Sequence, residues 1–329
     1  MFDQFGRRVR SLRLSVTDRC DLRCFYCMTE RVTFTSRREL CSLEELDRVC
    51  RVCIQLGVRK IRLTGGEPFV RNGFMKLVRS LSRHLRQGSL EELTITTNGI
   101  RLSQHAAELS EIGVRRINVS VDSLRPDRFL AITHHGRLAQ VLDGITAAAR
   151  AGLKIRINTV VLAGFNEDEL IELVLWSGDR GYDICFIEVM PLGTIGNSDG
   201  KYYIPISRVQ TELAKRFTLT ESNYRSSGPA RYVDCAETGK KIGFIAPMTH
   251  AFCESCDRMR LTCTGTLFPC LGQEHSVSLR APMRCSKEDT TLAAAITHAL
   301  WHKPRGHNFA TNTKINNQVV PRRMSITGG

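Results

Sequence analysis

Short β-like runs alternate with helix-like stretches through the first two thirds of the chain, and this rhythm restricts the fold more than any other feature. The β-like runs are Leu12–Val16, Lys60–Thr64, Leu93–Thr97, Arg116–Val121, Lys154–Leu162 and Asp183–Met190. The helix-like stretches lie near Leu43–Leu56, Phe74–Leu85, Ser103–Ile112, Arg137–Ala151 and Glu167–Trp176. Such alternation predicts an α/β fold with a parallel sheet. Because a closed barrel of eight units takes about 250 residues, or roughly 31 per unit, a sixth strand ending at Met190 predicts a partial, six-unit TIM-type β/α barrel.

Polar residues recur at every second position in all six runs. Strands of a parallel sheet covered on both faces would instead be apolar almost throughout. Because side chains two apart share one face of a strand, each run presents a polar face. The polar sets are Arg13 and Ser15; Arg62 and Thr64; Thr94, Thr96 and Asn98; Asn118, Ser120 and Asp122; Arg156 and Asn158; Glu188 and Met190. We therefore expect a barrel with a wet, functional interior rather than polar residues scattered at strand ends.

The strand-helix rhythm breaks beyond Pro191. Helices are still expected at Ile206–Arg216 and Thr290–Trp301, but the strands between them are short and separated by loops. We therefore expect two domains: a partial barrel over residues 1–217 and a smaller C-terminal domain over residues 218–329.

Length and composition are those of a globular protein. The 329 residues are 42% hydrophobic and 24% charged, which allows a sizeable core. No stretch approaches the ~20 apolar residues of a membrane span, and the first residues contain no apolar leader core, so we expect a cytoplasmic location and no membrane partner. The 13 cysteines then indicate metal ligands under reducing conditions rather than disulfides.

The formal net charge of +14 implies anionic partners. On charge alone, non-specific affinity for nucleic acid and a basic pocket for a phosphorylated small molecule both remain open. The chain has no nucleic-acid-binding motif and no basic stripe interleaved with aromatic residues. We therefore expect no stable nucleic-acid partner.

Cys20, Cys24 and Cys27 form a Cys-x3-Cys-x2-Cys motif directly after the first β-like run. Three thiolates so close in sequence can converge on one metal centre at little loop-closure cost. They supply three ligands where a closed tetrahedral site needs four, and the open position is where chemistry can occur. Zinc is possible, but a [4Fe–4S] cluster with one open iron is favoured because no His or fourth Cys lies nearby.

Cys253, Cys256 and Cys270 form a second set with the spacing Cys-x2-Cys-x13-Cys. Together with Cys263 they could close a four-cysteine zinc site. Cys263 lies in a strand-like run, however, and can also be read as a buried thiol. In that case the remaining three ligands would again leave an open metal position.

Arg258 and Arg260 lie two apart beside this second set, so both face the same way in a strand. Guanidinium groups bind phosphate through charge-assisted hydrogen bonds of about 1.5–3 kcal/mol each. We expect phosphate binding, with a solvated basic strand face as the alternative. The turn Gly65-Gly66-Glu67-Pro68, at the end of the second β-like run, would let the backbone approach a ligand closely; a plain strand-to-helix turn is its alternative reading.

Together these motifs resemble a known family. Tyr26 completes the form Cys-x3-Cys-x-Tyr-Cys that is typical of radical S-adenosylmethionine enzymes. With the Gly-Gly-Glu-Pro turn, the Arg-x-Arg beside the second cysteine set and the terminal Gly328-Gly329, the chain resembles the GTP 3′,8-cyclase family from about Phe5 to Gly329. Enzymes of that family begin molybdenum cofactor biosynthesis.

The resemblance implies a role for each matching residue. A first [4Fe–4S] cluster would be held by Cys20, Cys24 and Cys27, and a second, whose open iron meets guanine, by Cys253, Cys256 and Cys270. The residues that would hold S-adenosylmethionine are Tyr26, Gly66, Ser120 and Met190. The residues that would contact GTP are Arg13, Arg62, Thr96, Arg156, Arg258 and Arg260. Gly328 and Gly329 would belong to a tail that reaches into the active site, although many chain ends are merely disordered.

The implied reaction is a radical cyclisation of GTP by a lyase. Reductive cleavage of S-adenosylmethionine gives a 5′-deoxyadenosyl radical, which takes the 3′ hydrogen of GTP, and the resulting carbon radical attacks C8 of guanine. The product is (8S)-3′,8-cyclo-7,8-dihydroguanosine 5′-triphosphate. The resemblance further implies an electron donor, a downstream cyclic pyranopterin monophosphate synthase and a homodimer.

The chain departs from the family pattern at two positions. Cys185 stands where many members have Arg before Phe-Ile-Glu, which removes any contact made by that guanidinium group. Thr29 replaces the usual Pro after Cys-Met, a change expected to be mild. The cysteines that match no ligand pattern are expected to be structural thiols: Cys41, Cys50, Cys53, Cys235 and Cys285.

Two other functions remain open. One is a radical S-adenosylmethionine enzyme that modifies a peptide and carries an auxiliary cluster, although that class usually has a longer C-terminal cysteine set. The other is a zinc or iron–sulfur module that binds nucleic acid through its positive charge.

Overall fold

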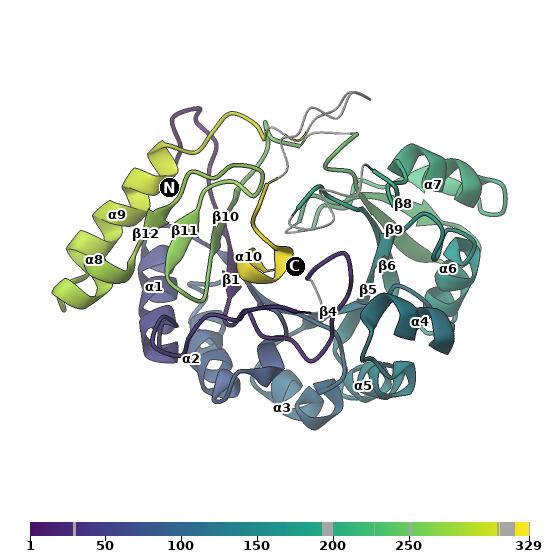
Figure 1. Ribbon diagram of the computed structural model, residues 1–329, viewed down its shortest axis with the longest axis horizontal. Helices are drawn as coiled ribbons and strands as arrows, with labels where there is room; N and C mark the ends of the chain where they lie inside the picture. The colour runs from purple at the N-terminus through teal and green to yellow at the C-terminus, as the bar shows by residue number, and fades with distance from the viewer. Residues whose placement is uncertain are drawn as a thin grey trace.

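The first six strands form the predicted parallel sheet. The computed structural model describes residues 1–28, 31–192, 200–226, 228–249, 252–307, 309 and 320–328. In chain order, neighbouring parallel strands are β1 (Ser11–Ser15), β2 (Lys60–Thr64), β3 (Glu92–Thr97), β4 (Arg116–Ser120), β5 (Lys154–Val161) and β6 (Asp183–Glu188). The sheet curves into an open barrel (Figure 1). The six-unit partial barrel expected from the strand-helix rhythm is confirmed.

Helices follow one another around the outside of this curve (Figure 1). They are α1 (Leu43–Gln55), α2 (Phe74–Arg86), α3 (Ala106–Glu111), α4 (Pro126–Thr133), α5 (Leu138–Arg150) and α6 (Leu170–Asp179), with 3-10 turns η1 (Pro68–Val70) and η2 (Leu102–Gln104). α1 begins at a capping box in which Ser42 and Glu45 satisfy each other's backbone N–H groups. The outward strand side chains, such as Leu14 and Leu63, are fully buried beneath the helices. α4 was not expected, and the predicted helix Ser103–Ile112 is split between η2 and α3.

The C-terminal strands extend both edges of the sheet. At the β6 edge lie β9 (Lys240–Ile245), β8 (Arg231–Cys235) and β7 (Leu219–Glu221), and at the β1 edge lie β10 (Arg258–Leu261), β11 (Thr266–Phe268) and β12 (Val277–Ser278). β9 runs parallel to β6 and β10 parallel to β1, whereas the outer pairs are antiparallel. One twelve-stranded sheet therefore connects the two predicted domains among the described residues.

The remaining helices are α7 (Ile206–Ala214), α8 (Arg280–Cys285), α9 (Asp289–Trp301) and α10 (Met324–Thr327). α7 and α9 confirm the two helices predicted in this part of the chain. α10 lies inside the curve of the sheet, beside β1 (Figure 1). The predicted domain boundary at residue 217 falls between α7 and β7 and stays a prediction.

The polar face predicted for the sixth strand, Glu188 and Met190, describes this strand only in part, although both residues border the interior. Pairing of β5 with β6 places Cys185 opposite Asn158, so Cys185 and the residues two apart from it face the interior. Glu188 is fully buried. Its carboxylate accepts hydrogen bonds from the Ile206 backbone N–H at 2.9 Å and the Thr249 hydroxyl at 2.6 Å. Glu188 therefore anchors the start of α7. Sheet register, rather than the local sequence pattern, decides which face of a strand is inside.

The unassigned cysteines separate into two groups. Cys41, Cys50, Cys53 and Cys235 are buried, as expected of structural thiols, whereas Cys285 is exposed. Thr29 lies outside the described residues. Within the described part of the chain, no helix combines the length and apolar character needed to cross a membrane.

Candidate active site

One large cavity opens on the concave side of the barrel, and it gathers the predicted site residues. Its lining includes both cysteine sets, Cys20, Cys24, Cys27, Cys253, Cys256 and Cys270. It also includes the other predicted contacts, Tyr26, Gly66, Ser120, Met190, Arg13, Arg62, Thr96, Arg156, Arg258 and Arg260. We call the two cysteine sets the first triad (Cys20, Cys24, Cys27) and the second triad (Cys253, Cys256, Cys270).

The first triad lies on the loop that follows β1. The backbone N–H of Leu22 donates to Cys20 Sγ at 3.3 Å, and the amide of Asn98 lies 3.8 Å from the same sulfur. The Cys27 N–H donates to the Cys24 carbonyl at 2.9 Å, which folds the loop back on itself. The sulfurs therefore face the cavity from a loop fixed by its own backbone.

Burial raises the pKa of all three first-triad thiols. Burial raises the pKa of Cys20 well above its usual value, and Glu67 adds to the rise. Burial likewise raises the pKa of Cys24, with Asp122 adding to it. Burial raises the pKa of Cys27 to about 11. Burial is thus the main cause at each thiol, with carboxylates adding to it at Cys20 and Cys24 and Arg323 opposing it at Cys27.

The Gly-Gly-Glu-Pro turn fastens this loop to the sheet. A Cβ on Gly66 would lie 2.2 Å from the carbonyl oxygen of Arg19, so only glycine allows the two backbones to approach. The Glu67 carboxylate accepts hydrogen bonds from Thr97 Oγ1 at 2.8 Å and the Asn98 N–H at 2.7 Å. These hydrogen bonds favour the charged carboxylate, but burial outweighs them and raises the pKa of Glu67 to about 7. The motif therefore joins the first triad to the end of β3.

Tyr26 is oriented by a carboxylate at the end of β4. Its hydroxyl donates to Asp122 Oδ2 at 2.7 Å, and the Val160 N–H donates to Asp122 Oδ1 at 2.9 Å. Burial raises the pKa of Asp122 to about 6, although both hydrogen bonds favour the charged form. Ser120 and Met190 line the same cavity. The polar strand pattern placed Asp122 inside the barrel but gave no indication of its bond to Tyr26.

Three guanidinium groups form a row across the cavity floor. The registers of β10, β1 and β2 place Arg260, Arg13 and Arg62 on adjacent strands at matching positions. Burial, then repulsion by Arg260 and Arg62, lowers the pKa of Arg13. Burial, with a smaller contribution from neighbouring arginines, lowers the pKa of Arg260 to about 9 and the pKa of Arg62 to about 10. Buried like charges side by side favour a bound polyanion.

A second row of polar side chains crosses the neighbouring strands. Thr96, Asn118 and Arg156 occupy matching positions on β3, β4 and β5. The guanidinium carbon of Arg156 lies 5.2 Å from the ring centroid of Tyr232. Cys185 packs with Tyr232 in a small apolar cluster. Cys185 therefore belongs to an apolar wall, and Arg156 places a positive charge against the ring of Tyr232 in the same wall.

The second triad lies beside cations. Arg258 Nη2 lies 3.8 Å from Cys256 Sγ. Burial alone would raise the pKa of Cys256, but the charges of Arg258 and Lys303 lower it to about 7. Burial raises the pKa of Cys270. The positive surroundings contrast with the carboxylates around the first triad.

The four-cysteine zinc site is not assembled. Cys263 is 1% exposed, and its carbonyl accepts a 2.8 Å hydrogen bond from the Cys41 N–H, outside the cavity lining. Among the described residues, no three His, Cys, Asp or Glu side chains are gathered closely enough to hold a single metal ion. The cavity instead holds two separate sets of three thiols, and N–H groups lie near the sulfurs of Cys20 and Cys256. Each set fits an iron–sulfur cluster, which is wider than a single ion, better than it fits one zinc ion.

The chain end reaches the arginine row. Gly328 has φ +84°, and a Cβ there would lie 2.0 Å from Thr64 Oγ1. Arg260 Nη1 donates to the carbonyls of Gly328 at 2.7 Å and Thr327 at 3.3 Å. A glycine is thus required by both conformation and space. Gly329 lies outside the described residues.

Sequence reasoning missed two cations behind the second triad. Arg7 Nη1 donates to the carbonyl of Cys253 at 2.7 Å, a residue 246 positions away. Lys303 Nζ donates to the carbonyls of Arg258 at 2.7 Å and Pro269 at 2.5 Å. No spacing pattern marks either side chain, because their partners are brought to them only by the tertiary fold.

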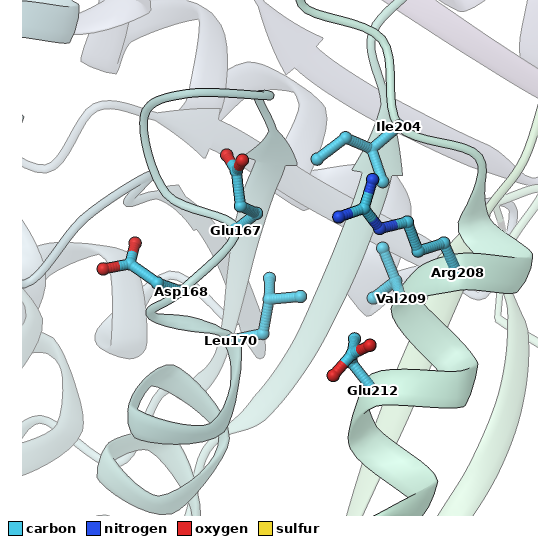
Figure 2. A pocket seen from close by; sticks show the side chains of 7 residues that line it. All are labelled: Glu167, Asp168, Leu170, Ile204, Arg208, Val209 and Glu212. Carbon is cyan, nitrogen blue, oxygen red and sulfur yellow. The ribbon is translucent and has the colours of Figure 1, made fainter.

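A smaller hollow of about 260 Å³ lies between α6 and α7 (Figure 2). Its lining is Glu167, Asp168, Leu170, Ile204, Arg208, Val209 and Glu212. Asp168 pairs with Arg128, and Glu212 pairs with Lys215 at 2.8 Å. Because no predicted site residue lines it, this hollow takes no part in the site.

Comparison with known proteins gives matching results for both parts of the chain. Residues 14–176 match the Radical SAM superfamily, and residues 182–309 match Molybdenum Cofactor Synthesis C. A GTP 3′,8-cyclase of Mesorhizobium japonicum is 54% identical over 329 residues, covering 100% of this chain and 99% of the relative. A GTP 3′,8-cyclase of Brucella canis is 53% identical, covering 100% of this chain and 96% of the relative. Streptococcus suis SuiB bound to the precursor peptide SuiA aligns with TM-score 0.60 at 15% identity, over 98% of this chain and 76% of that one, which concerns the fold alone.

Proposed function

Because the chain belongs to the GTP 3′,8-cyclase family of radical S-adenosylmethionine enzymes, we propose that its large cavity performs that family's reaction. The substrate is GTP, and the product is (8S)-3′,8-cyclo-7,8-dihydroguanosine 5′-triphosphate. This conversion is the first step of molybdenum cofactor biosynthesis. The observation that carries the proposal is a single cavity lined by two cysteine triads and by the row Arg260, Arg13 and Arg62.

The first triad is the proposed site of the radical-generating cluster. When bound, a [4Fe–4S] cluster there supplies the electron that cleaves S-adenosylmethionine to a 5′-deoxyadenosyl radical. Tyr26, Gly66, Ser120 and Met190 are the proposed contacts of S-adenosylmethionine. The bond between Tyr26 and Asp122 supports this role, because it fixes the Tyr26 ring against the cavity wall before any ligand binds.

GTP is proposed to lie between the two triads. Its triphosphate would offset the mutual repulsion of Arg260, Arg13 and Arg62, and each charge-assisted bond would contribute about 1.5–3 kcal/mol. Thr96 and Arg156 would contact the same nucleotide from the neighbouring strands. An unselective radical requires its target atom to be held in near-contact with water excluded, and these side chains provide that positioning.

A second [4Fe–4S] cluster is proposed at Cys253, Cys256 and Cys270, next to the guanine base. Arg258 would contact GTP at the same place, where its guanidinium lies near Cys256 Sγ. Gly328, together with Gly329 outside the described residues, is proposed to complete the site. The hydrogen bonds from Arg260 to the chain end support this role for the tail.

A peptide substrate is the second candidate, and no feature of this cavity favours it over GTP. Buried guanidinium groups in register on three strands suit a triphosphate better than a peptide backbone. A zinc module that binds nucleic acid is disfavoured by the separation of Cys263 from the second triad. An electron donor, a downstream cyclic pyranopterin monophosphate synthase, a homodimer and a cytoplasmic location remain part of the proposal.

The decisive experiment incubates anaerobically reconstituted protein with GTP, S-adenosylmethionine and a strong reductant. We expect 5′-deoxyadenosine and a 3′,8-cyclised nucleotide by mass spectrometry, with iron and sulfide content corresponding to two clusters. Absence of both products would refute the proposal. Stoichiometric zinc at the second triad would favour the binding module instead.

A further inference from the structure

Lys303 is a buried cation without a buried counter-charge. Its side chain is 1% exposed, and it lies just after α9. Nζ donates to two backbone carbonyls, those of Arg258 at 2.7 Å and Pro269 at 2.5 Å. No carboxylate among the described residues forms an ion pair with it. An ammonium group bonded only to neutral carbonyls loses its hydration without gaining an ion pair, which makes it costly to bury.

The two carbonyls that Lys303 contacts belong to the segments that carry the second triad. Arg258 lies two residues after Cys256, and Pro269 directly precedes Cys270. A single ammonium group therefore ties together two ligand segments that are separated in sequence by a β-hairpin, β10 and β11. These two bonds place the charge of Lys303 beside the segments of Cys256 and Cys270.

Arg7 contacts the same site from the other end of the chain, but its charge is already balanced. Its Nη1 donates to the Cys253 carbonyl at 2.7 Å, and its Nε pairs with the buried carboxylate of Asp3 at 2.6 Å. Further bonds run to the carbonyls of Pro304 and Arg305. Arg7 thus fastens the loop of Cys253 without leaving a net charge beside it.

We propose that Lys303 is a positioning residue that supplies the counter-charge for the metal cluster of the second triad. The inference rests on the proposed second cluster. An iron–sulfur cluster bound by three thiolates is net negative, and a fixed ammonium beside two of its ligands stabilises it, most strongly in the reduced state. Arg7 contributes only to the position of the Cys253 loop. A comparison of Lys303 with Arg7 therefore distinguishes an effect of charge from an effect of loop position.

The test isolates the second cluster in the full chain by combining Cys20→Ser, Cys24→Ser and Cys27→Ser. In this background, Lys303→Met, Lys303→Arg and Arg7→Met are compared with the parent. Iron and sulfide are counted, the reduced cluster is titrated by electron paramagnetic resonance against potential, and melting of the metal-free protein is recorded. We expect Lys303→Met to lower the reduced-to-oxidised ratio at a given potential by about tenfold, which is about 59 mV for one electron.

Lys303→Arg keeps the charge and is expected to titrate like the parent, as is Arg7→Met. Loss of second-site iron in Lys303→Met, with unchanged melting of the metal-free protein, would also support the proposal. An unchanged potential and iron content in Lys303→Met would overturn it, as would an equal shift in Arg7→Met. If Lys303→Met does not fold, the Lys303→Arg potential decides: the parent value supports the proposal, and a shift overturns it. A parent background without iron would refute the second cluster itself and the role of Lys303 with it.

Discussion

The two cysteine triads line one cavity but have opposite electrostatic surroundings. Around the first, burial and the carboxylates of Glu67 and Asp122 raise thiol pKa values. Around the second, Arg258 and Lys303 lower the pKa of Cys256 to about 7. The carboxylates beside the first triad would favour a ligand that carries positive charge, such as the sulfonium and ammonium groups of the proposed S-adenosylmethionine. The cations beside the second triad would favour an anionic ligand, such as the proposed GTP.

Removing one ligand from each triad gives the sharpest separation of their roles. Cys24→Ser should reduce both 5′-deoxyadenosine formation and cyclisation to below about a thousandth of the parent rates, because the triad acts as a unit. Cys270→Ser should abolish cyclisation to the same extent yet leave uncoupled cleavage of S-adenosylmethionine. Both products are measured by mass spectrometry after single-turnover incubation, with iron counted in each variant. Cyclisation that survives Cys270→Ser would contradict the second-cluster assignment.

Removing one charge from the arginine row should have two opposite effects, one on GTP affinity and one on the stability of the nucleotide-free protein. Arg13→Met should weaken GTP binding about tenfold to a hundredfold, the equivalent of one charge-assisted interaction. It should also leave the melting temperature of the nucleotide-free protein unchanged or raised, since burial and repulsion by Arg260 disfavour the Arg13 charge. Calorimetric titration and thermal melting measure the two quantities. Arg150→Met, on the exposed end of α5, is the matched control; equal GTP affinity in Arg13→Met and this control would count against the row.

The smallest expected difference is in thiol reactivity of the metal-free protein. At neutral pH, Cys256 should be alkylated by iodoacetamide at least about tenfold faster than Cys27, because thiolate is the reactive form and lower intrinsic nucleophilicity offsets only part of the gain. The rate at Cys256 should level off above pH of about 7, whereas that at Cys27 should keep rising towards pH of about 11. Peptide mass spectrometry resolves the two sites, which are both half-buried. Equal alkylation rates and pH profiles at Cys256 and Cys27 would contradict the difference in electrostatic surroundings between the two triads.

The sequence predicted the parts of the site that depend on local pattern. The polar faces of the first five strands follow from a period of two, and the triads from spacing along single loops. The same reasoning was incomplete at β6, where pairing with β5 places Cys185 opposite Asn158 and the buried Glu188 carboxylate binds the backbone at the start of α7. α4 was missed because it is short, spanning Pro126–Thr133, and its N-cap residue Arg125 makes no side-chain capping bond that the sequence would signal.

What lay beyond sequence reasoning are contacts between distant segments. The alignment of Arg260, Arg13 and Arg62 requires β10 to pair with β1, which no local pattern specifies. The burial of Lys303 depends on carbonyls from β10 and from the loop before Cys270. In both cases the residue types were visible, but their neighbours became known only with the fold.

The parallel pairing of β1 with β10 has a consequence for how the molecule is made. Ser11 pairs opposite Arg258, so β1 is synthesised long before the strand that completes its hydrogen bonding. Until then the β1 edge is an open template for pairing with other chains, and closing so long a loop slows folding. A nascent chain therefore passes through a stage in which β1, which carries Arg13 of the arginine row, is an unprotected edge strand. Protection by chaperones during that interval would matter more for this fold than for one built from local contacts.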